Sequence, residues 1–237
     1  MSDVEMRMTS PVTSIMRTDY LEMKPLLEWM RNVAPRFASG TLLDYGCGNR
    51  PYESLFQAGI QKYIGVDVVQ NKFNTVSYVV PTNALLPLEN DSVDTVLSTQ
   101  VLEHVSEPKD YIQEVARVLR PGGTFILTCP GTYMLHEEPY DFFRYTKYGL
   151  QHLLESHNFE IVRLDAAGGA WRLIGQTLVN HKTFGAKFRV PIIGGLTRRA
   201  WIFTANVLCE FLDRFNTNEK DTLNYMVIAR KKSGPAR

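Results

Sequence analysis

Two acidic residues lie on either side of a glycine-rich turn, at a spacing that could hold a nucleoside. Asp44 comes just before Gly46-Cys47-Gly48, and Asp67 follows 19 residues after Gly48. Glycines between a buried strand and a helix let a ligand approach the backbone and the free N–H groups of the helix. A carboxylate ending the next strand can accept hydrogen bonds from both hydroxyls of a ribose. The predicted nucleoside site comprises Asp44, Gly46, Cys47, Gly48, Asp67 and Val68.

The same turn argues against a dinucleotide. A dinucleotide fingerprint needs a third glycine, and this chain has Pro51 there. Asp44 would repel a pyrophosphate but attract a ligand that carries a sulfonium and an α-amino group. A sulfonium nucleoside is therefore the favoured ligand, and a nicotinamide-dependent oxidoreductase is the less favoured alternative.

Two histidines could act as the general base that a hydroxyl nucleophile requires. His104 follows the strand-like run 93–98, and His136 lies in the loop after the run 124–128. A neutral histidine can accept a proton near neutral pH. The structural alternative for His104 is a hydrogen bond to the loop backbone. We predict that the base is His104 or His136.

A polar and aromatic run, residues 136–146, follows the same strand. It interleaves a histidine, three carboxylates, an arginine and four aromatic rings. Such a mixture suits a sugar or another polyhydroxylated acceptor, because rings stack on it and polar groups bind its hydroxyls. The predicted acceptor-binding residues are Tyr133, His136, Tyr140, Arg144 and Tyr145.

The same run has structural interpretations. Its rings could belong to the core, which we favour for Phe142 and Phe143, and Arg144 could pair with Asp141 to brace the loop. The acids near His136 match no established metal-ligand spacing, so no metal site is predicted.

Apolar runs of four to eight residues alternate with amphipathic stretches, a pattern typical of a parallel sheet covered by helices. This pattern predicts an α/β fold. Helices are expected over 20–33, 51–58, 109–119 and 148–156. Strands are expected over 41–45, 63–68, 75–80, 93–98, 124–128, 160–164 and 224–230, with a turn at 120–123.

The chain resembles the class I S-adenosylmethionine (SAM)-dependent methyltransferases, in their type 11 branch. Four pieces carry the resemblance in order: residues 44–48 with Asp67, residues 85–96, residues 101–105 and residues 117–123. The resemblance implies a seven-stranded Rossmann-like sheet with an antiparallel last strand, helices on both faces, and SAM across the carboxyl ends of the first strands.

The resemblance also assigns roles to residues. Asp44 and the backbone of 46–48 would hold the methionine end of SAM, and Asp67 would hold the ribose. Asn83 and Ala84 would lie at the adenine, and Gln100 on the sulfonium side. The run 139–146 is similar to one in some bacterial methyltransferases of glycan and secondary-metabolite clusters.

The function that these observations predict is O-methylation of a small-molecule or glycan-type acceptor, including a lipid-linked one. A catalytically inactive binding or scaffold protein on the same fold is the alternative.

Composition limits the partners and the compartment. The chain has 26 basic and 25 acidic residues, a net charge of +1, which gives no overall field for nucleic acid. Three scattered cysteines predict a reducing, cytoplasmic location without disulfides. The sequence lacks the apolar run of a signal peptide and any run of the roughly 20 residues that span a bilayer.

The segment between the last two predicted strands is basic and aromatic. From Ala166 to Cys209 it contains six basic residues and no acid. It could cover the active site, pair two subunits in a homodimer, or lie against anionic lipid; the alternative is a simple helical cap. We expect one domain over 1–237: a helical segment (1–40), a SAM-binding core (41–165), a helical insertion (166–220) and a last strand (221–231).

Overall fold

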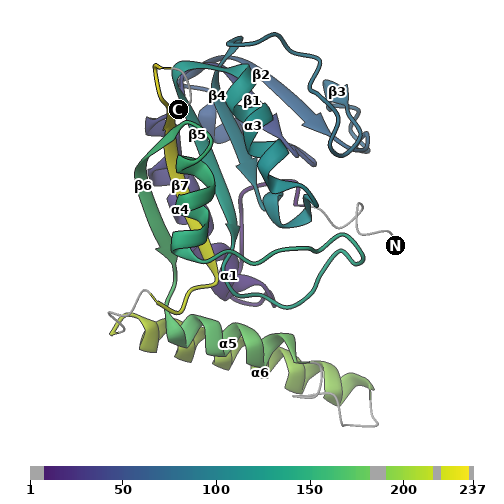
Figure 1. Cartoon of the computed structure of the whole chain (residues 1–237). Coiled ribbons are helices and arrows are strands. Elements are labelled where there is room, and N and C mark those ends of the chain that lie inside the picture. Colours follow the sequence, from purple (N-terminus) through teal and green to yellow (C-terminus); the bar gives the residue numbers. More distant parts are fainter. Residues whose placement is uncertain (1–7, 182–190, 216–219, 235–237) are drawn as a thin grey trace.

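The centre of the protein is a seven-stranded sheet in the order β3-β2-β1-β4-β5-β7-β6. The computed structural model describes residues 8–181, 191–215 and 220–234. The strands are β1 (Gly40–Tyr45), β2 (Ile60–Asp67), β3 (Tyr78–Val79), β4 (Val93–Thr99), β5 (Leu119–Pro130), β6 (Phe159–Ala167) and β7 (Asn224–Lys231). Only β7 runs antiparallel to its neighbours, β5 and β6 (Figure 1). The predicted sheet is confirmed.

Helices cover both faces of this sheet, as predicted (Figure 1). The helices α3 (Pro108–Val118) and α4 (Lys147–Glu155) pack on one face, and α1 (Tyr20–Asn32) and α2 (Glu53–Phe56) on the other. Successive side chains of a strand point to opposite faces. In β1, Leu43 therefore joins the core beneath α3, and Leu42 joins the core beneath α1.

Two predicted elements are clearly shorter in the structure, and one predicted turn is part of a strand. The strand expected over 75–80 shrinks to the two residues of β3, because Asn71 Oδ1 accepts a hydrogen bond from the N–H of Thr75 and keeps that stretch in a turn. The helix expected over 51–58 shortens to α2. The turn expected at 120–123 lies within β5, where a bulge opposite β4 takes up the extra residues and Gly122 adopts φ +76°.

The insertion before the last strand is helical. Its helices α5 (Ala170–Asn180) and α6 (Pro191–Asp213) lie side by side below the sheet (Figure 1). They attach to the rest of the protein mainly through α1: Tyr20 donates to Glu210 at 2.8 Å, and Lys24 also pairs with Glu210. None of the described helices is long and apolar enough to cross a membrane.

Candidate active site

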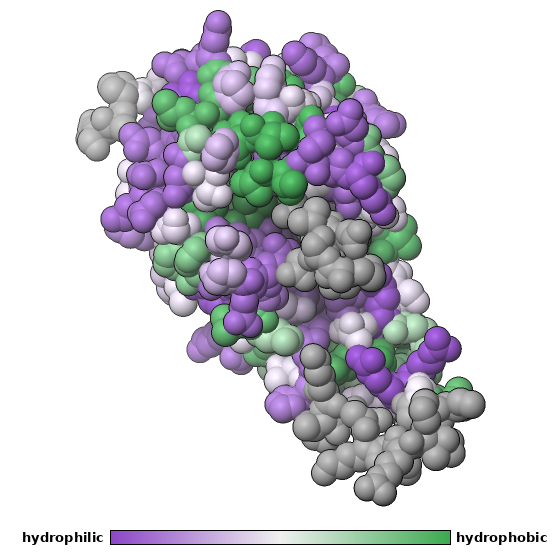
Figure 2. Space-filling model, turned by 90° about the vertical axis from the view of Figure 1, so that its right-hand side faces the viewer, coloured by the Kyte–Doolittle hydropathy of each residue, from purple (hydrophilic) through white to green (hydrophobic). Residues whose placement is uncertain are grey.

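A cavity of about 1330 Å³ opens at the carboxyl ends of the parallel strands. Its wall is built from residues that follow β1, β2, β3, β4 and β5, and Figure 2 shows hydrophobic side chains gathered around a hollow on this face. Open α/β sheets bind their ligands in this position. The volume exceeds the ~300–1,000 Å³ of an ordinary small-molecule pocket, so two ligands can fit.

The turn after β1 has the backbone that a closely bound ligand requires. Gly46 and Gly48 adopt φ +85° and +50°, values that disfavour other residues. A Cβ atom at Gly46 would also lie 2.3 Å from Cγ2 of Val101. Gly46 and Cys47 donate to the carbonyl oxygen of Val66 at 2.8 and 3.0 Å, which ties the turn to β2.

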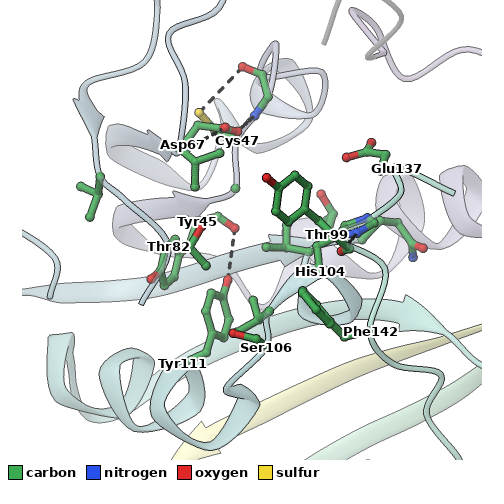
Figure 3. Close-up of a pocket in the computed structure, with 18 of the residues that line it drawn as sticks. Tyr45, Cys47, Asp67, Thr82, Thr99, His104, Ser106, Tyr111, Glu137 and Phe142 are labelled. Carbon is green, nitrogen blue, oxygen red and sulfur yellow. Dashed lines mark hydrogen bonds between the residues drawn. The ribbon is translucent and has the colours of Figure 1, made fainter. Parts of the chain in front are cut away.

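Asp67 ends β2 on the cavity wall. Its Oδ2 accepts from the N–H of Gly48 at 2.8 Å, and its Oδ1 accepts from the N–H of Val68 at 2.8 Å. Oδ1 also accepts from the N–H of Val69 at 3.3 Å, so three backbone N–H groups orient this carboxylate on the cavity wall. Figure 3 shows Asp67 and Cys47 together at one end of the pocket, away from His104 and Phe142.

Asp44 lies behind the wall rather than on it. Asp44 is 1% exposed and is not one of the residues that line the cavity. Tyr63, whose ring packs 4.5 Å from the Arg50 guanidinium, donates its hydroxyl to Asp44 Oδ2, and Oδ1 is buried without a partner. Burial raises the pKa of Asp44 to about 7. Its charge thus lies behind the glycine turn, and direct contact with a ligand stays a prediction.

The other predicted cofactor residues lie on the wall. Val68, Asn83, Ala84 and Gln100 all line the cavity. Asn83 donates to Ser106 Oγ at 3.2 Å, and Gln100 donates to Thr128 Oγ1 at 3.1 Å. Tyr45 and Tyr111, which were not predicted from the sequence, also line the cavity, and their stacked rings have centroids 4.3 Å apart.

His104 and His136 lie next to each other at the end opposite Asp67, with ring centroids 4.8 Å apart. His104 ends the short helix η3 (Leu102–His104) that follows β4, and its Nδ1 lies 2.8 Å from the carbonyl oxygen of Tyr140. His136 Nδ1 lies 3.2 Å from Asp141 Oδ2. The structure therefore brings together the two histidines that were predicted as alternative bases.

Glu103 lies directly behind this pair. Its side chain is fully buried, neither carboxylate oxygen has a hydrogen-bond partner, and Oε1 lies 3.9 Å from His104 Nε2. Burial raises its pKa to about 8. A buried polar group is nearly always hydrogen-bonded, so this carboxylate needs an explanation. Glu103 was not predicted as a site residue, because a glutamate beside a histidine is ordinary until its burial is known.

Some of the predicted acceptor residues line the cavity, and the others stabilise the loop that forms its wall. Tyr133, His136 and Tyr140 line the cavity. Arg144 and Tyr145 do not. Arg144 pairs with both oxygens of Asp141 at 2.6 and 2.7 Å and donates to the carbonyl oxygens of Tyr133 and Met134, so it braces the loop.

Two further contacts complete this loop. The Tyr145 hydroxyl donates to the carbonyl oxygen of Leu102 at 3.2 Å. Against the effect of burial, the hydrogen bonds of Asp141 to Arg144 and to the N–H of His136 lower its pKa to about 2. Phe142, which we favoured as a structural residue, lines the cavity.

The N-terminal segment contributes wall residues that the sequence analysis missed. Asp19, Glu22 and Met23 line the cavity. Glu22 falls on the apolar face of α1, one turn before Leu26, and an acid on an apolar face was the available signal. Burial raises its pKa to about 7, although bonds to Tyr133 and Asn224 oppose the rise. Among the described residues none beyond 142 lines the cavity, so the predicted covering role of the insertion is not seen there.

Comparisons with known proteins agree with this geometry. Residues 43–127 match the family model described as a methyltransferase domain. An uncharacterized methyltransferase of Mycobacterium ulcerans is 37% identical over 109 residues, 42% of this chain and 43% of that protein. A probable S-adenosylmethionine-dependent methyltransferase of Mycolicibacterium smegmatis is 33% identical over 107 residues, 42% of each chain. The chain thus spans less than half the length of these relatives.

The fold also has solved counterparts. An S-adenosylmethionine-dependent methyltransferase from Mesorhizobium loti superimposes with a TM-score of 0.56 over 89% of this chain and 100% of that one, at 16% identity. A likeness at this identity concerns the fold alone. With the strand order and the antiparallel β7, the likeness shows that the chain has the fold of these proteins, and residues 43–127 are similar to their methyltransferase domain.

Proposed function

We propose that this protein transfers a methyl group from SAM to a hydroxyl oxygen of a small-molecule or glycan-type acceptor. The observation that carries the proposal is one continuous cavity with the glycine turn and Asp67 at one end and the histidine pair at the other. The relatives that match this segment are named methyltransferases.

The residues present fit SAM. Asp67 offers a carboxylate to the ribose, and Asn83 and Ala84 line the wall where the adenine would lie. The turn at Gly46 leaves no room for a Cβ atom, and the buried Oδ1 of Asp44 is unpartnered behind it. Bound there, SAM supplies a methyl group on a sulfonium.

The protein's own residues would orient the acceptor and exclude water, which is most of what an in-line methyl displacement requires. Tyr133, Tyr140 and Phe142 line the cavity together with His104 and His136, and the rings of Tyr133 and His136 lie 5.5 Å apart. Rings and imidazoles so arranged suit a sugar better than a flat apolar acceptor. That His104 or His136 receives the proton stays a prediction.

Ligand binding tests the cofactor assignment. We expect SAM and S-adenosylhomocysteine, but not NAD, to raise the melting temperature, because only a ligand of the native state stabilises it by mass action. Asp67→Ala should weaken SAM binding by about tenfold or more, since a lost hydrogen bond to a charged group costs ~1.5–3 kcal/mol. Calorimetry measures this directly.

The matched control is Glu160→Ala, which removes an exposed carboxylate from β6, outside the cavity lining. If Asp67→Ala binds SAM within about twofold of the unaltered protein, the cofactor assignment is wrong. The acceptor class is tested by mass spectrometry on panels of sugars, phenols and amines, where we expect one added methyl on a sugar hydroxyl.

A further inference from the structure

Three side chains of types that bind metal ions lie close together beside the acceptor end of the cavity. Glu103, His104 and His136 each offer one ligand atom, and these atoms all lie within 4.8 Å of one another. The stretch after β4 supplies the first two residues, and the loop after β5 supplies the third. Two imidazoles and one carboxylate with open positions are a recurrent binding set for divalent transition metals.

The two histidines have their other ring nitrogens engaged by polar atoms. His104 Nδ1 lies 2.8 Å from the carbonyl oxygen of Tyr140, so it carries the proton and leaves a lone pair on Nε2. His136 Nδ1 lies 3.4 Å from Arg144 Nη2 in a hydrogen bond and 3.2 Å from Asp141 Oδ2, so Asp141 is the partner only when Nδ1 carries a proton. Metal-bound histidines usually donate their second N–H to a carbonyl or a carboxylate, as His104 does here.

Glu103 supplies an independent observation. Its side chain is fully buried, and neither carboxylate oxygen has a hydrogen-bond partner. The nearby guanidinium of Arg144 is engaged by Asp141. Buried carboxyl oxygens without hydrogen bonds are costly, and a cation shared with His104, whose Nε2 lies 3.9 Å from Oε1, would give this group a partner.

We propose that Glu103, His104 and His136 bind a divalent transition cation of the zinc or manganese type, with open positions facing the cavity. Metal–ligand distances near 2.0–2.2 Å place neighbouring ligand atoms about 3–3.5 Å apart, so the present separations must close by about 1 Å. His136 lies on a loop with 30% of its side chain exposed, and it is the ligand that can move.

The inference rests on the proposed function and names its substrate class. An acceptor hydroxyl bound to the cation loses its proton to water more easily, because the cation lowers the pKa of the hydroxyl. The oxygen then forms a bond to the methyl carbon as the sulfur–carbon bond breaks, and that electron pair stays on sulfur. Two neighbouring hydroxyls can fill two open positions, which favours a sugar diol. In this inference the two histidines hold the cation, which replaces their predicted role as the base.

Metal titration of the chelator-treated full chain tests this inference. We expect calorimetry with zinc or manganese chloride to show one ion bound per chain, and cobalt chloride to give a ligand-field absorption spectrum. Glu103→Gln and His136→Ala should each weaken binding by at least about tenfold. His152→Ala, an exposed histidine on α4, is the matched control and should bind the ion unchanged.

Thermal unfolding and SAM titration of each variant separate loss of the site from loss of the fold. If Glu103→Gln does not fold, His136→Ala decides, because its side chain is partly exposed. Failure to bind one ion per chain, or binding that survives both substitutions, overturns the cation site while SAM binding still stands. If the unaltered protein binds the ion but not SAM, the proposed function is the part that fails.

Discussion

Asp44 has a buried carboxylate with one unpartnered oxygen, and this lowers the stability of the folded state near neutral pH. Burial raises its pKa to about 7, whereas an unfolded chain has a value near 3.9. Between about pH 4 and pH 7 the folded state holds a proton that the unfolded chain has lost. Stability therefore falls as pH rises through this window and stays low above it.

Asp44→Asn should remove one part of that dependence, because buried Glu22 and Glu103 also have raised pKa values. We expect the ligand-free variant to melt several degrees higher than the unaltered protein at about pH 8, and this difference to shrink as the pH is lowered to about 5. The same variant should bind SAM more weakly, because the negative charge behind the turn is gone. Melting curves at both pH values and calorimetry with SAM measure the two effects.

The control for this prediction is Glu155→Gln on α4, which neutralises an exposed acid and should alter neither property. An Asp44→Asn protein that melts lower at pH 8 than the unaltered one would contradict the assigned charge penalty.

At the residue scale, the sequence could identify only those site residues whose role follows from their spacing along the chain. The glycine turn and Asp67 were predictable because the turn follows one apolar strand directly and Asp67 ends the next strand along the chain. Glu103 was not, because its missing partners depend on the loop after β5 folding over it. Arg144 needed the structure for a similar reason, since an arginine near an acid suits a substrate and a brace equally.

Packing of α5 against α1 depends on the absence of a side chain at Gly175. A Cβ atom there would lie 2.6 Å from Leu21 Cδ1 and 2.7 Å from Cys209 Sγ. Gly175→Val should therefore force α5 away from α1 and α6, at a cost of about 1–3 kcal/mol for overpacking. Urea unfolding should show the loss.

Thr177→Val is the matched control, since it places the same β-branched residue at an exposed position of α5. Equal stability for Gly175→Val and the control would mean that α5 does not pack on α1 as described.

At the element scale, the sequence predicted well which segments form buried strands, but it predicted poorly where those strands begin and end. The apolar runs of β1 and β4 pair with neighbouring strands inside the sheet, so their assignment as strands was clear from the sequence. The Arg120-Pro121-Gly122-Gly123 stretch has the composition of a turn, yet β4 holds it within β5 around a bulge. Only the partner strand decides that outcome.

The helical pair α5 and α6 is joined to the body of the protein through a narrow base. Besides contacts with α1, Gln176 and Asn206 donate to backbone carbonyls of residues 15–18, and Glu210 binds Tyr20 and Lys24. Phe203, Leu208 and Phe211 of α6 remain exposed. Pairing of two subunits and contact with anionic lipid thus stay predictions for this face.

Because α5 and α6 contact the rest of the protein over a small area, we expect this helical pair to unfold locally while the sheet stays folded. In hydrogen exchange, amides of α5 and α6 should exchange faster than those of β4 and β5, because fewer long-range contacts hold them. Lys24→Met should speed exchange in α6 further and leave the sheet unchanged. Exchange in α6 as slow as in β5 would show instead that the molecule unfolds as one unit.

The place of β7 in the sheet bears on how the protein is made. β7 lies between β5 and β6, and its first six residues are buried. On the ribosome, a nascent chain that has emerged as far as β6 exposes an unpaired apolar edge on β5 throughout the synthesis of α5 and α6. Open strand edges of this kind invite aggregation. A holdase chaperone should therefore raise the yield of this protein during translation, before β7 is available to close the gap.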